Sequence, residues 1–393
     1  MIHLERIVLR EIHLPLVEPF QTAGGTVVAR RVLLLELTDA DGTTAWSECV
    51  AESLPSYSAD TVDTCWLAIT EWLAPRVLGS TFDTPRDVHE ALDRNVRGHA
   101  MARAAIEMGV WALVAQRAGR PLAELLLEGS RFARNGGAVL RHDVATGIAV
   151  GMQRDPAALV ARVEAARARG YQRVRIKVGP GRDVEYVRAV REALGDTLSL
   201  GVDANCSYTL ADAEHVRALA ELDGLGLEFI EQPLAHDDLV RHAELQRRLA
   251  TPICLDESIT GAARVDDAIA LGSGRMINLK PGRVGGFTEA ITVHDHCARA
   301  GIPMWCGGML ETGIGRAYNV ALAALPNFTF PGDLSPSARY WARDIVRPEW
   351  TMDAEGRVRV PLDRPGIGVE VDTGMIQELV NREVVVTATA STR

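Results

Sequence analysis

Five ionisable residues recur at nearly regular intervals through the middle of the chain. They are Lys177, Asp203, Glu231, Asp256 and Lys280, and the intervals between them are 26, 28, 25 and 24 residues. Each stands at the end of a short apolar run, and a helical pattern follows each run. Because the active sites of parallel barrels form at the carboxyl ends of the strands, we predict that these five side chains converge at one mouth.

The three carboxylates in this series suit a hard metal ion. Carboxylates brought together in a partly dry cleft repel one another and take up protons unless a cation keeps them ionised. Ligands from Asp203, Glu231 and Asp256, with no His or Cys among them, favour Mg²⁺ over Mn²⁺. A single strand-end Asp is as readily a helix cap, so the prediction depends on all three together. The two lysines are then expected on opposite sides of a substrate that lies on the metal.

The strand that ends in Lys177 has an unusual cationic face. In the stretch RVRIKV, Arg173, Arg175 and Lys177 fall on one face and apolar residues fall on the other. Strands of a covered parallel sheet are normally apolar throughout. A cationic face is tolerable if it points into a site that holds three carboxylates and an anionic substrate. We expect Arg175 to keep a fixed charge that lowers the pKa of Lys177, and Arg173 to pair with a structural acid.

The apolar pattern predicts two kinds of architecture. Residues 1–50 alternate like strands around the turn DADG, and residues 60–127 follow helical periods, which together predict an α+β domain. From about residue 145, strand-like runs alternate with helices, and this repetition favours a closed parallel barrel. A doubly wound sheet is the alternative, but no Gly-x-Gly-x-x-Gly follows a strand. The strand candidates are TGIAVGM, RVRIKV, LSLGVD, LEFIE, PICLD, RMINLK and IPMWC.

The composition argues against several classes of protein. With a formal net charge of −10 and no long basic block, the chain is not expected to bind nucleic acid. It has no apolar run of about 18 residues, and charges interrupt its first residues, so neither a membrane span nor a signal peptide is expected. The six cysteines form no C-x-x-C pair, which favours the cytoplasm. Five histidines in charged or helical runs are interpreted as solvated: His215, His236, His242, His294 and His296.

The strand-end motifs resemble those of a known enzyme family. The series RIKV, VDAN, IEQP, CLDES, NLKPGRVGG and WCGGMLETGIGR is similar to the enolase superfamily, in its muconate-lactonizing subgroup. Within that subgroup it looks most like the o-succinylbenzoate synthase / N-acylamino acid racemase family, and the resemblance covers nearly the whole chain. It implies a (β/α)7β modified TIM barrel over residues 140–339. It also implies an α+β capping domain over residues 1–135, which the C-terminal segment 340–393 joins.

The resemblance also implies roles for individual residues. The three carboxylates match the metal ligands, and the two lysines match the catalytic residues of the family. Arg175, Asn205 and Glu257 match positions that support the metal ligands, although the family usually has a lysine where Arg175 stands. The positions that match substrate-binding residues are Phe20 and Tyr57 in two capping-domain loops, Arg283 in the NLKPGR motif, and Gly307, Gly308, Met309 and Leu310 after the seventh strand.

The reaction that the resemblance implies is removal of the proton next to a carboxylate, through an enediolate intermediate that the metal stabilises. In a synthase, Lys177 removes the proton, and 2-succinyl-6-hydroxy-2,4-cyclohexadiene-1-carboxylate is dehydrated to o-succinylbenzoate for menaquinone biosynthesis. In an N-acylamino acid (N-succinylamino acid) racemase, one lysine removes the proton and the other returns one on the opposite face. Both lysines are present, so the sequence allows both reactions.

Two alternatives stay open from the sequence. Another enzyme of the subgroup, a dipeptide epimerase or a cycloisomerase, needs different contacts after the seventh strand. A non-catalytic barrel that binds a metal or ligand is the alternative of another class. Loss of a metal carboxylate or of both lysines would indicate it, and neither is lost. The expected partner is a small-molecule carboxylate, and a homo-oligomer is expected.

Overall fold

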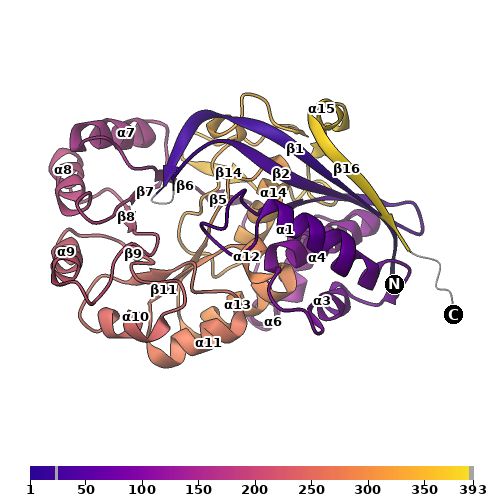
Figure 1. Cartoon of the computed structure of the whole chain (residues 1–393), viewed down its shortest axis with the longest axis horizontal. Coiled ribbons are helices and arrows are strands. Elements are labelled where there is room, and N and C mark those ends of the chain that lie inside the picture. The colour runs from indigo at the N-terminus through magenta and orange to yellow at the C-terminus, as the bar shows by residue number, and fades with distance from the viewer. Residues whose placement is uncertain (23–24, 389–393) are drawn as a thin grey trace.

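The computed structural model describes residues 1–22 and 25–388, and Figure 1 shows how its elements are arranged. A long antiparallel sheet lies beside a cluster of helices from the first third of the chain. Parallel strands with outer helices form the rest of the molecule. Within the described residues, no helix combines the length and the apolar character that a membrane span needs.

Both ends of the chain contribute to the antiparallel sheet. Its strand order is β16-β1-β2-β3, and a short strand β4 also pairs with β1. β16 runs antiparallel to β1 with Arg382 opposite Glu11, and the two side chains form an ion pair at 2.7 Å. The last strand of the chain is therefore built into the first sheet. The strands are β1 (Ile2–Thr22), β2 (Gly25–Asp39), β3 (Thr44–Cys49), β4 (Thr81–Phe82) and β16 (Val380–Thr387).

Helix α4 (Ala100–Ala118) packs closely on this sheet. Gly109 permits the approach, since a Cβ there would lie 2.6 Å from Leu37 Cδ1 of β2. The predicted helix WLAITEWLAPRVL is broken into α1, a π-helix η1 and α2, where Pro75 lacks an N–H to donate. The other helices of this part are α1 (Val62–Leu67), η1 (Ala68–Leu73), α2 (Ala74–Val77), α3 (Pro85–Asp93), α5 (Leu122–Gly129) and α6 (Arg131–Asn135).

Seven parallel strands form the second sheet, in the order β12-β11-β10-β9-β8-β7-β6. Every neighbouring pair is parallel, and each strand lies within one of the seven predicted runs, so those strand predictions are confirmed. The strands are β6 (Gly147–Val150), β7 (Arg173–Lys177), β8 (Leu200–Asp203), β9 (Ile230–Glu231), β10 (Ile253–Leu255), β11 (Met276–Leu279) and β12 (Met304–Cys306).

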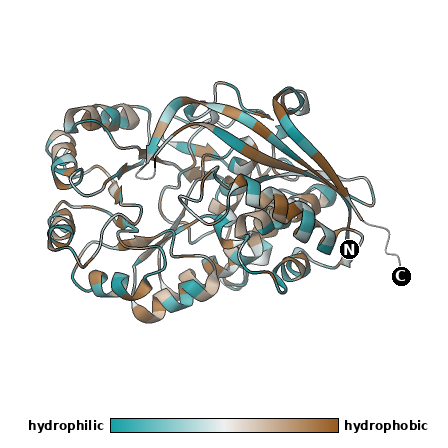
Figure 2. Cartoon of the chain, viewed as in Figure 1, coloured by the Kyte–Doolittle hydropathy of each residue, from teal (hydrophilic) through white to brown (hydrophobic). Residues whose placement is uncertain are grey.

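The segment 328–332 closes this sheet into a barrel. Phe328 pairs with Met304 and Gly332 pairs with Thr146, both as parallel bridges, so the segment lies between the first and last strands. The predicted (β/α)7β barrel is therefore confirmed. Figure 2 shows hydrophilic and hydrophobic residues alternating along the outer helices α10 and α11. The barrel helices are α7 (Pro156–Ala168), α8 (Val184–Leu194), α9 (Ala213–Asp223), α10 (Leu239–Gln246), α11 (Ala262–Leu271), α12 (Pro281–Val284), α13 (Phe287–Ala300) and α14 (Gly313–Ala323).

The remaining short elements connect the barrel to the C-terminal strand. β14 pairs with β5 just before the first barrel strand, and β13 pairs with β15. These elements are β5 (Asp143–Ala145), η2 (Ser337–Arg339), β13 (Val346–Arg347), β14 (Arg357–Arg359), β15 (Glu370–Val371) and α15 (Thr373–Leu379).

The barrel interior holds a buried arginine. The guanidinium carbon of Arg173 lies 4.0 Å from the centre of the Trp305 ring and 5.4 Å from that of Phe229. Gly147 on β6 leaves room for it, because a Cβ there would lie 2.6 Å from Arg173 Nε. Its charge is matched by Asp333 at 2.9 Å, so the expectation that Arg173 pairs with a structural acid is confirmed.

Candidate active site

The carboxyl ends of five consecutive strands bring the predicted ionisable residues together. In the β7–β8 and β8–β9 registers, Lys177 lies opposite Asp203, and Asp203 lies opposite Glu231. Asp256 and Lys280 are the first residues after β10 and β11. The register fixes these positions, because a shift of one residue would turn a side chain to the other face. Lys177 Nζ lies 2.7 Å from Asp203 Oδ2, and Lys280 Nζ lies 2.8 Å from Asp256 Oδ2.

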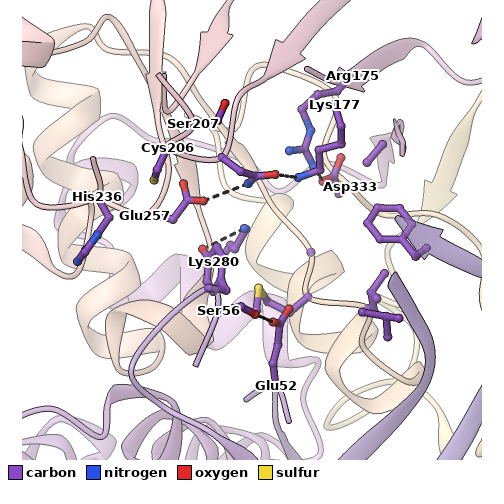
Figure 3. Close-up of a pocket in the computed structure, with 18 of the residues that line it drawn as sticks. Glu52, Ser56, Arg175, Lys177, Cys206, Ser207, His236, Glu257, Lys280 and Asp333 are labelled. Carbon is purple, nitrogen blue, oxygen red and sulfur yellow. Dashed lines mark hydrogen bonds and ion pairs between the residues drawn. The ribbon is translucent and has the colours of Figure 1, made fainter. Parts of the chain in front are cut away.

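A cavity of about 420 Å³ lies at this mouth of the barrel. Its wall combines residues of the strand ends with residues from the antiparallel-sheet side of the molecule, including β1 and the loop between β3 and α1. Figure 3 shows how the charged side chains of the wall are grouped. The predicted site residues that line the cavity are Phe20, Tyr57, Arg175, Lys177, Asn205, Glu257, Lys280, Gly308, Met309 and Leu310.

The other predicted site residues lie behind the wall. The three candidate metal carboxylates are at most 1% exposed. Arg283 is also buried, and it donates to the carbonyl oxygen of Ile259 at 2.8 Å and to the Tyr57 hydroxyl at 2.7 Å. Gly307 makes room for a lysine, since a Cβ there would lie 2.7 Å from Lys280 Cε. Arg283 and Gly307 therefore act on the cavity through their neighbours.

Sequence reasoning missed eight residues of the wall. Cys206 and Ser207 directly follow the predicted site residue Asn205, and this position in the sequence could have indicated them. Asp333 follows the segment that closes the barrel, whose strand character the apolar pattern does not show. The others come mainly from loops, which carry no periodic signal. The eight residues are Val27, Glu52, Ser56, Cys206, Ser207, His236, Asp333 and Tyr340, and Ala149 of β6 completes the wall.

Arg175 lies among three carboxylates. One arm of its guanidinium donates to Asp203 and to Glu231, and the other arm donates to Asp333. Asp333 also accepts from Arg173, so the two arginines share it. Burial opposes a charged Arg175, but the three carboxylates outweigh this effect and hold its pKa well above its usual range. Arg175 therefore carries the positive charge expected beside Lys177, and three neighbouring carboxylates pair with that charge.

The surroundings of Lys177 come from the barrel alone. Its ammonium group donates to Asp203 at 2.7 Å and to Asn205 Oδ1 at 2.6 Å, and the Asn205 amide donates to Glu257 at 3.1 Å. Figure 3 shows Lys177 and Glu257 linked in this way through one side chain. Burial raises the pKa of Asp203, but Lys177 and Arg175 reverse the effect and lower it below the usual value. Burial and the neighbouring carboxylates raise the pKa of Glu257 to about 7.

The surroundings of Lys280 also include a residue from the first third of the chain. Lys280 Nζ donates to Asp256 at 2.8 Å and to the Tyr57 hydroxyl at 3.0 Å, and it lies 4.3 Å from the centre of the Tyr57 ring. Tyr57 in turn donates to Asp256 at 3.1 Å, and Arg283 also binds Asp256. Burial opposes a charged Lys280, but Asp256 outweighs it and raises the pKa of Lys280 above its usual range.

The chemistry of the three buried carboxylates fits a hard divalent ion, because all the donors are oxygen atoms. Burial, together with Asp203 and Asp256, raises the pKa of Glu231 well above its usual range, so an added cation would favour its ionised form. As the side chains stand, no group of three His, Cys, Asp or Glu residues within the described ranges is arranged as a metal centre. The reason is that Asp203 turns to Arg175 and Lys177, and Asp256 turns to Lys280 and Arg283.

The interpretation of the helical histidines as solvated is wrong for His242 and His294, which are fully buried. Each lies on the inner face of its helix and has local polar partners. His242 Nδ1 lies 2.6 Å from the carbonyl oxygen of Asp238, and His294 Nδ1 lies 2.9 Å from Asp295 Oδ1. His236 is exposed, as expected, but it lies at the rim of the cavity. Charged neighbours along a helix therefore did not indicate which face was buried.

Two family models match the chain. The enolase C-terminal domain-like model matches residues 158–375, and the N-terminal domain model of mandelate racemase / muconate lactonizing enzyme matches residues 5–126. The o-succinylbenzoate synthase of Geobacillus stearothermophilus is 44% identical over 376 residues, which are 96% of each chain. The N-succinylamino acid racemase of an Amycolatopsis species is 44% identical over 381 residues, 97% of this chain and 98% of the relative.

Solved structures agree with these sequence matches. The crystal structure of an enolase-superfamily member from Listeria innocua superposes with a TM-score of 0.90 at 36% identity, covering 98% of this chain and all of the other. Muconate lactonizing enzyme from Pseudomonas fluorescens shares the fold, with a TM-score of 0.87 at 24% identity. The protein therefore belongs to the enolase superfamily, with an N-terminal domain of the mandelate racemase / muconate lactonizing enzyme type.

Proposed function

We propose that this protein removes the proton next to a carboxylate of a small-molecule substrate, as an o-succinylbenzoate synthase, an N-succinylamino acid racemase, or both. The observation that carries the proposal is the placement of Lys177 and Lys280 at one cavity, each paired with a different buried carboxylate. A lysine within hydrogen-bond reach of the reacting carbon can act as a general base or acid. Relatives with both names match the chain at 44% identity.

The metal is part of this proposal: Mg²⁺, or Mn²⁺, held by Asp203, Glu231 and Asp256. Bound there, the ion supplies positive charge to the substrate carboxylate and makes the neighbouring proton more acidic. Neighbouring side chains support this role by orienting Glu231. Arg175 donates to one of its oxygens at 2.9 Å, and Asn278 donates to the other at 2.8 Å.

The capping domain, residues 1–135 with 340–393, is proposed to close the cavity over the barrel, residues 140–339. Phe20 and Tyr57 support this role because both line the cavity from the antiparallel-sheet side. Tyr57 also reaches the strand ends of the barrel, where its hydroxyl donates to Asp256, 199 residues away in the chain. A cover of this kind shields the reacting groups from water and holds the substrate in place.

The two lysines are proposed to play different parts in the two reactions. In the synthase reaction, Lys177 removes the proton and delivers it to the departing hydroxide, while Lys280 stays charged against the anion. The raised pKa of Lys280, which Asp256 maintains against the effect of burial, supports that second part. In the racemase reaction, one lysine removes the proton and the other returns one on the opposite face. Lys280 must then lose its proton before it can act as the base.

A combined assay tests the proposal. The protein is incubated in D₂O with each enantiomer of several N-succinylamino acids, and in parallel with the synthase substrate. We expect deuterium at the α-carbon, o-succinylbenzoate formation, or both, and loss of activity after EDTA treatment that Mg²⁺ restores. Absence of both reactions would refute the function. Full turnover after EDTA treatment in metal-free buffer would refute only the metal assignment.

We further propose that the protein is cytoplasmic and forms a homo-oligomer. All six cysteines are free thiols, which suits a reducing compartment. Leu67 and Trp72 are 48% and 45% exposed, and large exposed apolar side chains often mark interaction surfaces. Light scattering during gel filtration would test the assembly, and a monomeric mass would refute it.

A further inference from the structure

The loop between β3 and α1 places a carboxylate in the cavity wall that the proposed chemistry does not use. Glu52 lines the same cavity as Lys177 and Lys280. Its backbone is anchored at the rim, because the Val62 N–H donates to the Glu52 carbonyl at 2.8 Å, and Glu52 pairs with Thr61 as a parallel β-bridge. The fold therefore fixes the point from which this carboxylate enters the cavity.

Two carboxylates of the wall have no partner of opposite charge among the described residues. One is Glu257, which follows Asp256 and accepts from the Asn205 amide at 3.1 Å, and the other is Glu52 in the loop between β3 and α1. Glu52 accepts a hydrogen bond from Ser56 Oγ at 3.1 Å, and no Lys, Arg or His within residues 1–22 and 25–388 forms an ion pair with it. The cations of the cavity are already matched, since Arg175, Lys177 and Lys280 each pair with buried carboxylates. Figure 3 shows Glu52 and Ser56 at one end, Arg175 and Lys177 at the other, and Lys280 between them.

We propose that Glu52 selects substrates with a positively charged amino-acid side chain, so that N-succinylarginine and N-succinyllysine are preferred. This inference rests on the proposed racemase function and deepens it. The substrate carboxylate belongs between Lys177 and Lys280, next to the proposed metal ligands. The succinyl arm ends in a second carboxylate, which Glu52 would repel, so that arm must point elsewhere in the cavity. The side chain is the arm left to reach Glu52, and a terminal cation there pairs with it.

The expected preference is moderate, because Glu52 is only half-buried. An opposite charge about 4 Å away in such a partly exposed site favours binding by about tenfold. The ion pair is made equally in the bound substrate and in the transition state, so it should lower KM and leave kcat nearly the same. Added salt should weaken the preference, because both charges are within reach of solvent ions.

A pair of nearly isosteric substrates isolates the charge. N-succinyl-L-arginine and N-succinyl-L-citrulline differ chiefly in a guanidinium and a neutral urea of similar shape. We expect a ratio of kcat/KM of about ten in favour of the arginine substrate, carried mainly by KM. The ratio should fall to about one in Glu52→Gln and stay in Glu52→Asp. Glu71→Gln removes a charge from the exposed surface of η1, outside the cavity, and should keep the unmodified protein's ratio.

The possible results distinguish the role of Glu52 from the racemase function on which it rests. Equal kcat/KM for the two substrates, or a ratio that Glu52→Gln does not change, would overturn the role of Glu52 and leave the racemase function standing. If neither substrate is racemised, the racemase function fails, and titration calorimetry with the same two compounds decides the subsite. Tighter binding of N-succinyl-L-arginine that Glu52→Gln removes would support it, and equal affinities would overturn it.

Discussion

The two lysines of the cavity have surroundings of different origin. Lys177 is held by Asp203 at 2.7 Å and by Asn205 at 2.6 Å, both from the next strand and the loop after it. Lys280 is held by Asp256 at 2.8 Å, and also by Tyr57 at 3.0 Å, which lies 223 residues earlier in the chain. The position of Lys177 thus depends on barrel register, whereas that of Lys280 also depends on how the first third of the chain meets the barrel.

This difference indicates how one residue type can take two tasks. Asp256 raises the pKa of Lys280 against the effect of burial, and Tyr57 and Arg283 complete a closed group around that carboxylate. A lysine fixed in this way is suited to stabilise negative charge on a substrate. Lys177 also pairs with a carboxylate, Asp203, but its second partner is Asn205 of the barrel, and we assign this lysine the task of moving the proton. Variants of each lysine should therefore affect the two reactions unequally.

The largest effect is expected from Lys177→Ala. Both proposed reactions need a base on that side of the substrate, so synthase turnover and racemisation should each fall about 10³-fold. Steady-state assays of both reactions measure this loss, and a circular dichroism spectrum checks that the variant is folded. If either reaction kept near-normal turnover, Lys177 would not be its base, and the proposed difference between the lysines would be wrong.

Lys280→Arg should separate the reactions. Arginine keeps the positive charge but does not give up a proton near neutral pH, so racemisation should fall at least about 10²-fold while part of the synthase activity stays. In D₂O, the enantiomer from which Lys177 removes the α-proton should still exchange that proton, because one base can remove and return it. NMR of each enantiomer measures this exchange. Equal exchange of both enantiomers would contradict the assignment of two bases.

Arg175→Met should chiefly affect stability. The change leaves Asp203, Glu231 and Asp333 without their shared cation in a buried place, which costs about 3 kcal/mol of the free energy of unfolding. Urea unfolding measures this cost. Arg175→Lys keeps the charge, and its activity should stay within about tenfold of the original protein. A Met variant with unchanged stability would show that the three carboxylates do not depend on Arg175.

The sequence could predict the Lys177 side more completely than the Lys280 side, for a physical reason. Strand period and βα spacing determine which residues stand at the strand ends, and the register then puts Lys177, Asp203 and Glu231 at one height. The same logic finds Asp256 and Lys280. The seven strands could be predicted too, because each is a short apolar run between helical patterns.

The contacts that cross from the first part of the chain to the barrel could not be derived from periodicity. Glu52 and Ser56 lie in a loop without strand or helix period, and only tertiary packing brings them to the cavity. The sequence pattern also did not indicate that Asp333 is the carboxylate shared by Arg173 and Arg175. The reason is that Asp333 follows the irregular segment that closes the barrel. Tyr57 was found through family resemblance, whereas its bonds to Lys280 and Asp256 required the structure.

The smallest expected effect is a shift in the pH dependence of Tyr57→Phe. The Tyr57 hydroxyl accepts a hydrogen bond from Lys280 at 3.0 Å, and this bond favours the charged lysine. Without it, the pKa of Lys280 should fall, so the unprotonated base becomes available at lower pH. For the enantiomer whose exchange Lys280→Arg abolishes, the rising limb of the pH–rate profile should move down by about half a unit.

A matched control distinguishes this shift from a general effect of losing a buried hydroxyl. Tyr208→Phe makes the same change at a tyrosine whose hydroxyl donates to Asp183 at 2.9 Å, outside the cavity lining. Its profile should keep the position of the unmodified protein. The other enantiomer, served by Lys177, should also show no shift in Tyr57→Phe, because Tyr57 does not bond to that lysine. If the rising limb moved equally for both enantiomers, Tyr57 would affect the pKa of both lysines. The assignment of Tyr57 to the surroundings of Lys280 alone would then be wrong.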